Sequence, residues 1–166
     1  MSEPNIKFNE NTALCAECGG RCCKRMGCEA SVSDVFGKRK PSIEKLKDFL
    51  ATGGFAIDSW EGDPTAGGRE LTFFVRAAHK GVTHLYDPSW GGECVFITPT
   101  GCALSWAKRP YGGKALVPDR PHCHTTYSKR DCAIDWYPYQ WMFDSILDDM
   151  EFRFSIDPAC IGGVAG

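Results

Sequence analysis

Residues 15–23 read CAECGGRCC, so four of the ten cysteines of the chain lie within nine positions. Cysteine is common in protein cores, but a core distributes it at the period of a helix or a strand, whereas a chelate needs several thiolates that converge on one point. The two adjacent glycines in this stretch let the backbone turn so that the sulfurs can converge. The stretch therefore predicts a metal site around which the fold is organised.

The length and net charge of the chain limit the number of domains and the kinds of partner that we expect. With 166 residues, of which 43% are hydrophobic, the chain is large enough to bury one core, and we expect a single cysteine-rich metal-binding domain over residues 1–166. The net charge is only −2, from 19 basic and 21 acidic residues that are interspersed along the chain. Nonspecific binding of nucleic acid needs a basic face that neutralises phosphates, so no nucleic-acid partner is expected.

The expected compartment decides how the cysteines are interpreted. Residues 1–10 are polar and no later apolar run is long enough to span a bilayer, so we expect a cytoplasmic protein without a membrane partner. Thiols stay reduced in the cytosol, which favours metal ligation over a disulfide framework. The even cysteine count keeps disulfides open as the alternative, although the neighbours Cys22 and Cys23 would have to direct two bridges apart.

Hydrophobic patterns predict an early helix followed by a hairpin. Residues 42–50 place apolar side chains on one face and end before two glycines, which is typical of a helix. Residues 71–78 alternate as a strand does, and we expect them to pair with residues 82–86 across a short turn. A second, tighter hairpin is expected further along. Residues 94–98 and 102–104 flank a Pro-Thr-Gly turn and would bring Cys94 and Cys102 close together.

A closing helix is predicted to begin near Pro138. Its apolar face would comprise Met142, Phe143, Ile146, Leu147 and Met150. The segment between the second hairpin and this helix is rich in proline and glycine, and we expect a loop held in place by metal ligation. The predicted fold is thus α+β, a small metal-organised domain with short antiparallel hairpins and two or three helices.

Taken together, these residues resemble a known family, the CxxCxxCC proteins (YkgJ type), described as a zinc- or iron-chelating domain. The resemblance covers most of the chain. It is carried by residues 15–23, by WGGECVFI at 90–97 leading to GCAL at 101–104, by Arg109-Pro110 and by WYPYQ at 136–140. It implies that a set of cysteines binds a metal or an iron–sulfur cluster, in a family whose biochemical activity is mostly unassigned.

The chain departs from the family pattern in two places. Three residues, rather than two, separate Cys18 from Cys22. In addition, the family's Arg-Pro is usually followed after two residues by a cysteine, and that position is Gly113 here. Either Cys132, His122 or His124 takes the place of the missing ligand, or the site keeps an open coordination position, which would favour reactivity over a structural role.

The expected metal ligands are all cysteines. They are Cys15, Cys18, Cys22, Cys23, Cys94, Cys102, Cys123 and Cys132. Eight thiolates correspond to two complete four-thiolate sites, and zinc ions or an iron–sulfur cluster are both compatible with such ligands. Arg109 is expected at the surface, with a hydrogen bond to a thiolate as the alternative.

Two cysteines and two histidines stay outside this ligand set. Cys28 and Cys160 are expected to be free thiols, because buried cysteine is common without any chemistry. His79 and His84 fall on the first expected hairpin, where a surface or pairing role is expected.

Three functions remain open at this point. The first is a metal-binding protein in which zinc or an iron–sulfur cluster ties distant segments together. The second is an iron–sulfur enzyme or redox partner that uses an open cluster position. The third and weakest is a peptide- or protein-binding scaffold, which would require Trp136, Tyr139 and Trp141 to be exposed. No sequence motif of a hydrolase, kinase or metalloprotease is present, so whether the protein is an enzyme stays undecided.

Overall fold

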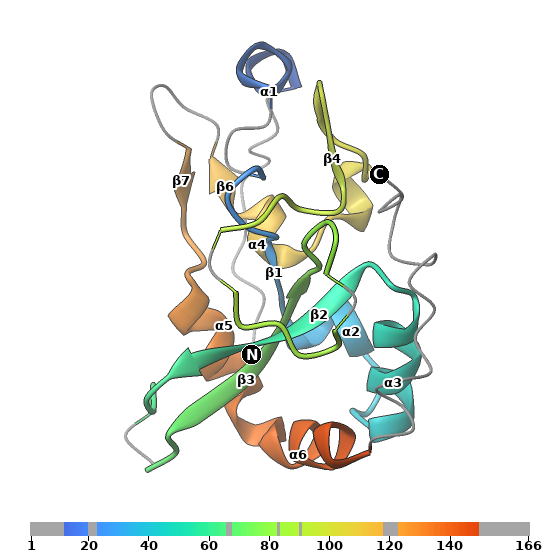
Figure 1. The fold of residues 1–166 in the computed structure, drawn as a ribbon, viewed down its shortest axis with the longest axis vertical. Helices are drawn as coiled ribbons and strands as arrows, with labels where there is room; N and C mark the ends of the chain where they lie inside the picture. Colours follow the sequence, from blue (N-terminus) through green and yellow to red (C-terminus); the bar gives the residue numbers. More distant parts are fainter. Residues whose placement is uncertain are drawn as a thin grey trace.

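A three-stranded antiparallel sheet with the strand order β1-β3-β2 forms the centre of the molecule (Figure 1). The computed structural model describes residues 12–19, 23–65, 68–82, 84–89, 91–117 and 123–149, and for Thr12 and Cys18 the backbone alone. Strand β3 (Leu71–Ala77) lies between β1 (Glu29–Ala30) and β2 (Phe55–Glu61). The register pairs Val75 with Ile57 on one side and with Ala30 on the other.

Both faces of β3 are covered. Every residue from Thr72 to Ala77 is buried except Phe73, which is partly buried. The core against this strand is built around Trp136, whose side chain has no exposed surface and whose Nε1 donates to the Ala30 carbonyl at 2.8 Å. Helices α5 (Lys129–Trp136) and α6 (Gln140–Asp148) pack on β3, while α3 (Ile43–Ala51) contacts β2 and α6. Figure 1 shows α3 and α6 together on the lower side of the sheet.

Two of the predicted helices are confirmed. In α3 the Ser42 hydroxyl caps the first turn by accepting from the Lys45 amide, and Leu46 and Leu50 are buried. In α6 the buried side chains are Gln140, Met142, Phe143 and Ile146, which include three of the five apolar residues expected on this face; Met150 lies outside the described residues. The 3-10 turn η2 (Tyr137–Tyr139) precedes α6, so the α-helix begins two residues later than Pro138.

The expectation of a loop before the closing helix is wrong, because α5 lies there. Ser128 and Asp131 form a reciprocal capping box at its start, which satisfies amides that a helix leaves unpaired. The same device, made by Ser31 and Asp34, begins α2 (Val32–Phe36). Counting only the described residues, the chain forms six α-helices rather than two or three, and the α+β class is confirmed.

The first predicted hairpin is also wrong. Strand β3 is confirmed, but it pairs with β2 rather than with residues 82–86. Segment 85–87 runs instead along β2, where the Ile57 amide donates to the Leu85 carbonyl and the Asp87 amide to the Ile57 carbonyl, both at 2.8 Å. The residue at the turn, His79, is buried, whereas His84 is exposed as expected.

The second predicted hairpin is confirmed in a shorter form. It consists of β4 (Ile97–Thr98) and β5 (Gly101–Cys102), with Ile97 opposite Cys102. The remaining short elements are α1 (Thr12–Cys18), the 3-10 turn η1 (Trp106–Lys108), α4 (Tyr111–Lys114), β6 (Leu116–Val117) and β7 (His124–Thr125). In Figure 1 these elements gather on the upper side of the sheet, opposite α3 and α6. None of the helices among the described residues is long and apolar enough to cross a bilayer.

Candidate functional site: a thiol group beside a buried charge network

Three segments distant in sequence meet on the upper side of the sheet. The Cys94 amide donates to the Cys23 carbonyl at 2.7 Å, which joins the loop after the first cysteines to the segment before β4. The Cys28 carbonyl accepts from the Ala77 amide at 2.8 Å, so the same loop ends as an extension of β1 along β3. The β4–β5 hairpin then brings Cys102 to the same place. Backbone hydrogen bonds therefore fix where these cysteines lie.

Four thiols interact there, and we call Cys23, Cys28, Cys94 and Cys102 the thiol group. The Cys28 thiol donates a hydrogen bond to the sulfur of Cys23. The charge of Cys94 acts on Cys28, and the charges of Cys23 and Cys102 act on Cys94. Cys94 also has a hydrogen bond with the Cys28 backbone, and the charge of Cys23 acts on Cys102. The predicted proximity of Cys94 and Cys102 is thus confirmed. Cys28, which the sequence analysis left outside the ligand set, is at the centre of the group.

The four thiols differ in their readiness to ionise. The hydrogen bond from Cys28, opposed by burial and assisted by Arg109, lowers the pKa of Cys23 to about 7. The same hydrogen bond, together with burial, raises the pKa of Cys28 well above its ordinary value. Burial also raises the pKa of Cys94 to about 12 and raises the pKa of Cys102. Cys23 is therefore the thiol of the group that ionises most readily near neutral pH.

Arg109 is the cation beside the thiol group. Its guanidinium hydrogen-bonds to Cys102 and interacts with Cys23, and it lies 5.7 Å from the centre of the Trp106 ring. Its Nε also donates to the Leu104 carbonyl at 3.2 Å, which fixes the side chain in this direction. For Arg109 the sequence predicted a surface position, with a hydrogen bond to sulfur as the alternative. The structure contains the hydrogen bond to sulfur. A fixed guanidinium offsets part of the negative charge of clustered thiolates.

The other predicted ligands lie in different surroundings. Cys15 is half-buried in α1 and close to the hairpin turn, since a Cβ added to Gly101 would lie 3.4 Å from the Cys15 Cβ. The side chain of Cys18, and Cys22 as a whole, lie outside the described residues, as do His122 and Cys160. Cys123 is half-buried just before β7, and His124 is exposed on that strand.

Cys132 belongs to the hydrophobic core. Its side chain has no exposed surface, and its Sγ donates to the Ala30 carbonyl at 3.4 Å and to the Val75 carbonyl at 3.8 Å. Burial raises its pKa well above the ordinary value, and none of the groups that act on its pKa is another cysteine. Cys132 therefore has the surroundings of a packed core thiol rather than those of a member of the thiol group.

Gly113 lies next to the sulfur of Cys28. It lies in α4, and a Cβ added there would be 3.7 Å from the Cys28 Sγ and 3.6 Å from the Arg109 Cβ. A cysteine at position 113 would thus lie beside the sulfur of Cys28. The sequence analysis left Cys28 outside the ligand set because buried cysteine is common without any chemistry. The glycine at position 113 was the signal that another cysteine could take part in its place.

The thiol group has the chemistry of a metal site but only part of its geometry. Its chemistry fits, because thiolate sulfur is the ligand that zinc and iron–sulfur iron prefer, and four thiolates complete a tetrahedral site. Its geometry is only partly in place: within the described ranges, no three or more Cys, His, Asp or Glu side chains are arranged closely enough to hold an ion. Cys23 and Cys28 are hydrogen-bonded to each other, and a metal held by both sulfurs would replace this hydrogen bond.

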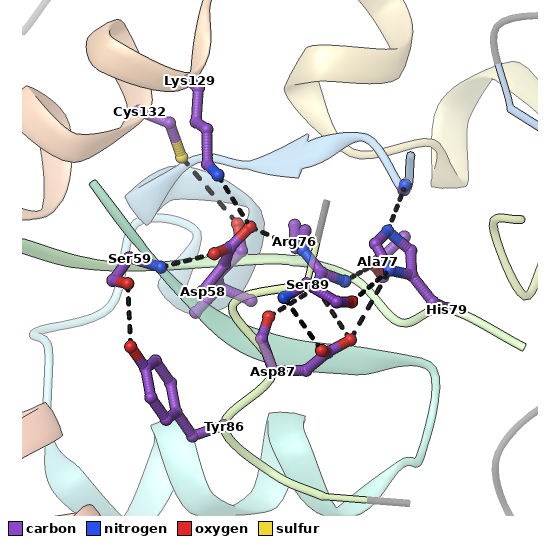
Figure 2. Close-up of polar contacts among 12 residues, drawn as sticks. Asp58, Ser59, Arg76, Ala77, His79, Tyr86, Asp87, Ser89, Lys129 and Cys132 are labelled. Carbon is purple, nitrogen blue, oxygen red and sulfur yellow. Dashed lines mark hydrogen bonds and ion pairs between the residues drawn. The ribbon is translucent and has the colours of Figure 1, made fainter. Parts of the chain in front are cut away.

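A buried network of charges is centred on Arg76 of β3 (Figure 2). Arg76, which has no exposed surface, donates from Nε to Asp58 at 2.8 Å and from Nη2 to the Asp87 carboxylate at 2.9 Å. Lys129 reaches the same Asp58 oxygen from α5, with 3.3 Å between Nζ and Oδ2. Two cations and two carboxylates thus compensate each other, which is the condition for keeping such charges out of water.

His79 connects this network to the thiol group. Its Nε2 accepts from the Gly27 amide at 3.1 Å, and its Nδ1 lies 3.2 Å from Ser89 Oγ and 3.5 Å from Asp87 Oδ2. Burial and the neighbouring Arg76 lower the pKa of His79, so the ring is neutral at pH 7. Gly92 packs flat on the ring, where a Cβ would lie 2.7 Å from its atoms. His79, for which a surface or pairing role was expected, is buried, forms an isolated bridge with Cys94 and holds the loop before Cys28 in place.

A cavity of about 240 Å³ adjoins the thiol group on the side of α5. Its walls include the backbone and side chains of residues 26–29, together with Gly112, Leu116, Thr125 and residues 127–129. Cys28 is part of this wall and also of the thiol group, so a molecule in the cavity would lie next to the thiols. Burial raises the pKa of Glu29, whose carboxyl group faces Gly112.

Comparison with known proteins gives no match to a family model, to a curated protein or to a solved structure. Arguments about function therefore rest on the residues and their geometry.

Proposed function

We propose that the protein binds zinc or an iron–sulfur cluster through the thiol group, as the resemblance to the CxxCxxCC proteins implies. One observation supports the proposal: three segments separated by up to about eighty residues bring Cys23, Cys28, Cys94 and Cys102 near enough for each to influence the pKa of at least one of the others, beside a fixed arginine. A protein core does not require four thiols at one point, whereas a chelate does.

The proposed ligand set differs from the one expected from sequence. Cys28 enters it because its sulfur is hydrogen-bonded to Cys23, and Cys132 leaves it because its sulfur is committed to the core. Cys15 stays a candidate for a second site together with Cys18 and Cys22, and Cys123 stays a prediction. A bound metal would cross-link the start of the chain to the β4–β5 hairpin, and its binding free energy would add to that of folding.

Elemental analysis of the protein purified without oxygen tests the proposal. We expect at least one zinc per chain with no colour, or iron with acid-labile sulfide and a broad visible absorption band. Cys28→Ser should lower this metal content. Cys132→Ala is the matched control, because it removes a cysteine and destabilises the core but should leave the metal content unchanged. Protein that binds neither metal after reconstitution under reducing conditions would overturn the proposal.

A dithiol–disulfide role is the second candidate, and the direct hydrogen bond between Cys23 and Cys28 favours it. The Cys23 thiolate would attack a disulfide such as oxidised glutathione, and Cys28 would then displace the mixed disulfide, so that one protein disulfide and two glutathione thiols form. Peptide mapping after such oxidation distinguishes the two roles. A Cys23–Cys28 disulfide that forms equally fast with and without added zinc would favour redox chemistry, whereas protection by zinc would favour the metal site.

The scaffold alternative has lost its main support. Trp136 is fully buried and Tyr139 is partly buried, which leaves only Trp141, at 56% exposure, of the three aromatic residues that this reading requires. A single exposed tryptophan is normal at a protein surface.

A further inference from the structure

We propose that the cavity beside the thiol group binds a small neutral aromatic molecule that carries one hydroxyl group, such as a phenol. The proposal goes beyond metal ligation, and its test does not require metal. The cavity holds about 240 Å³. An apolar cavity of about 150 Å³ holds one benzene ring, so this cavity has room for a ring with a small substituent but not for a nucleotide or a peptide.

The apolar part of the cavity wall suits an aromatic ring. Met26 and Leu116 supply apolar side chains from two segments, and Tyr127 supplies a ring. Edge contact with Tyr111, at 4.6 Å between ring centres, holds the Tyr127 ring in position. Aromatic rings stabilise one another in offset or edge contact, and thioether sulfur packs favourably at the edge of a ring. The wall therefore favours an aromatic ligand over an aliphatic one of the same size.

The hydroxyl and ammonium groups of the wall are bonded within the protein. Thr125 Oγ1 donates to the Tyr127 carbonyl at 3.0 Å, and the Ser128 hydroxyl belongs to the cap of α5. The Lys129 Nζ lies 3.3 Å from Asp58 Oδ2, and Figure 2 shows it directed from α5 toward that carboxylate. What Lys129 contributes to the wall is mainly its aliphatic stem. An anion, or a molecule with several hydroxyl groups, would therefore lose hydrogen bonds to water that the wall does not replace.

Two carboxyl groups lie behind the wall, close enough to act on the Tyr127 hydroxyl. Asp135 accepts from the Val32 amide at 2.8 Å and from the Tyr127 hydroxyl at 3.4 Å. Asp34 accepts from two backbone amides, at 2.6 and 2.7 Å. Neither carboxyl group is part of the wall itself. Both are thus held by donors of the protein, and a neutral ligand leaves the charges around the cavity as they are.

Glu29 is the wall residue that can bind the hydroxyl group of the ligand. Its Oε2 lies beside Gly112, another wall residue, where an added Cβ would be 2.9 Å away. Among the described residues no side chain donates a hydrogen bond to it; its own backbone amide is its partner. A carboxyl group accepts hydrogen bonds with or without its proton, because lone pairs remain in both forms. A neutral hydroxyl group therefore suits Glu29 in either protonation state.

Titration with phenol, followed by amide NMR of the protein as purified, tests the proposal. We expect saturable shifts at Gly112, Leu116 and Thr125, with a dissociation constant on the order of a millimolar, as a ligand of this size allows. Toluene has the same shape without the hydroxyl group, and cyclohexanol has the hydroxyl group without the aromatic ring. Each should bind roughly threefold more weakly or worse, and the anion benzoate roughly tenfold. Equal or stronger binding of any of the three, or phenol shifts that do not saturate, would overturn the proposal.

Variants of Glu29 separate hydrogen bonding from charge. Glu29→Leu removes the acceptor and should lower the affinity for phenol to that for toluene. Glu29→Gln keeps an acceptor without the charge and should bind phenol as the wild type does. An undiminished preference for phenol over toluene in Glu29→Leu would show that Glu29 is not the acceptor. An equal loss in both variants would show that charge holds the ligand and would refute the assignment.

A variant that fills the cavity decides the question if Glu29→Leu does not fold. Leu116→Trp adds a large ring to the wall without changing any charge and should abolish phenol binding. Ile134→Trp, which places the same ring at an exposed position of α5, is the matched control and should change nothing. Unchanged binding in folded Leu116→Trp would show that phenol binds elsewhere, which contradicts the proposal.

Discussion

Moving a ligand from Cys28 to Gly113 is the most direct test of the thiol group. Cys28→Ser removes one proposed sulfur ligand, and the added change Gly113→Cys introduces another from α4. A Cβ at Gly113 would meet its nearest neighbours at 3.6 to 3.8 Å, which is ordinary van der Waals contact, so the new side chain fits without strain. From there its sulfur can approach the place that the Cys28 sulfur leaves.

The expected size of the effect follows from the number of ligands. Structural zinc binding by four ligands is worth about 10–16 kcal/mol, so one ligand contributes roughly 3 kcal/mol if the four share it equally. At about 1.4 kcal/mol for each tenfold change, Cys28→Ser should weaken zinc binding roughly a hundredfold. The double variant should recover most of this loss, because it restores four thiolates.

Competition with a chromophoric zinc chelator measures both affinities, and circular dichroism confirms that each variant is folded. The matched control is Cys28→Ser with Gly113→Ser, which has the same size but no sulfur at either position and should stay weak. Full metal affinity in Cys28→Ser alone would show that Cys28 is not a ligand. Equal affinity of the folded cysteine and serine double variants would show that Gly113 does not face the site.

Three further predictions concern the support of the site. Asp58→Asn should destabilise the protein by about 3–5 kcal/mol in chemical denaturation, because it leaves Arg76 and Lys129 with Asp87 as the remaining carboxylate of the network. Asp144→Asn breaks an exposed pair with Arg69 and should cost less than about 1 kcal/mol, and similar losses in both variants would contradict this account. Gly27→Ala should destabilise by about 1–3 kcal/mol or more, since its methyl group would overlap the Ala77 carbonyl oxygen, and a stability equal to wild type would show that the two strands can separate there at no cost. Burial raises the pKa of the Asp34 carboxyl, so the folded state holds its proton more tightly than the unfolded state does. The stability of the wild type relative to Asp34→Asn should therefore fall as the pH rises from 3.8 through the folded-state pKa. A stability difference between the two proteins that does not change with pH would exclude this linkage.

The sequence predicted those elements whose signals are local. Helix α3 has its cap and its apolar stripe within one segment, and the β4–β5 hairpin has its turn residues between its strands. The helix α5 also had a local signal, the spacing of Ser128 and Asp131, which was masked by the proline and glycine content of the preceding segment. The sequence thus contained the signal for α5, but the proline and glycine content of the neighbouring residues was given more importance than the capping residues.

Other features depended on pairing that no local pattern contains. Strand β3 alternates in a way that fits any antiparallel partner. Its actual partner β2 precedes it and carries a buried aspartate, and aspartate is depleted in strands. Asp58 is tolerated there only because Arg76 and Lys129 converge on it from a strand and a helix. The place of Cys28 in the thiol group likewise depends on how its loop joins β3, which the spacing of cysteines does not reveal.

His79 links the charge network to the thiol group, because it contacts Asp87 on one side and the Gly27 amide, next to Cys28, on the other. For the Gly27 amide to donate to Nε2, that nitrogen must carry no proton, so the single proton of the neutral ring lies on Nδ1, where Ser89 and Asp87 face it. Asp87 keeps its negative charge because hydrogen bonds from Ser89 and Arg76 outweigh its burial and lower its pKa. Arg76 thus acts on the loop before Cys28 through Asp87 and His79, at a distance from every sulfur. It follows that Asp58→Asn, which touches no cysteine, should weaken metal binding as well as folding, and an unchanged zinc affinity in that variant would show that the loop keeps its place without the network.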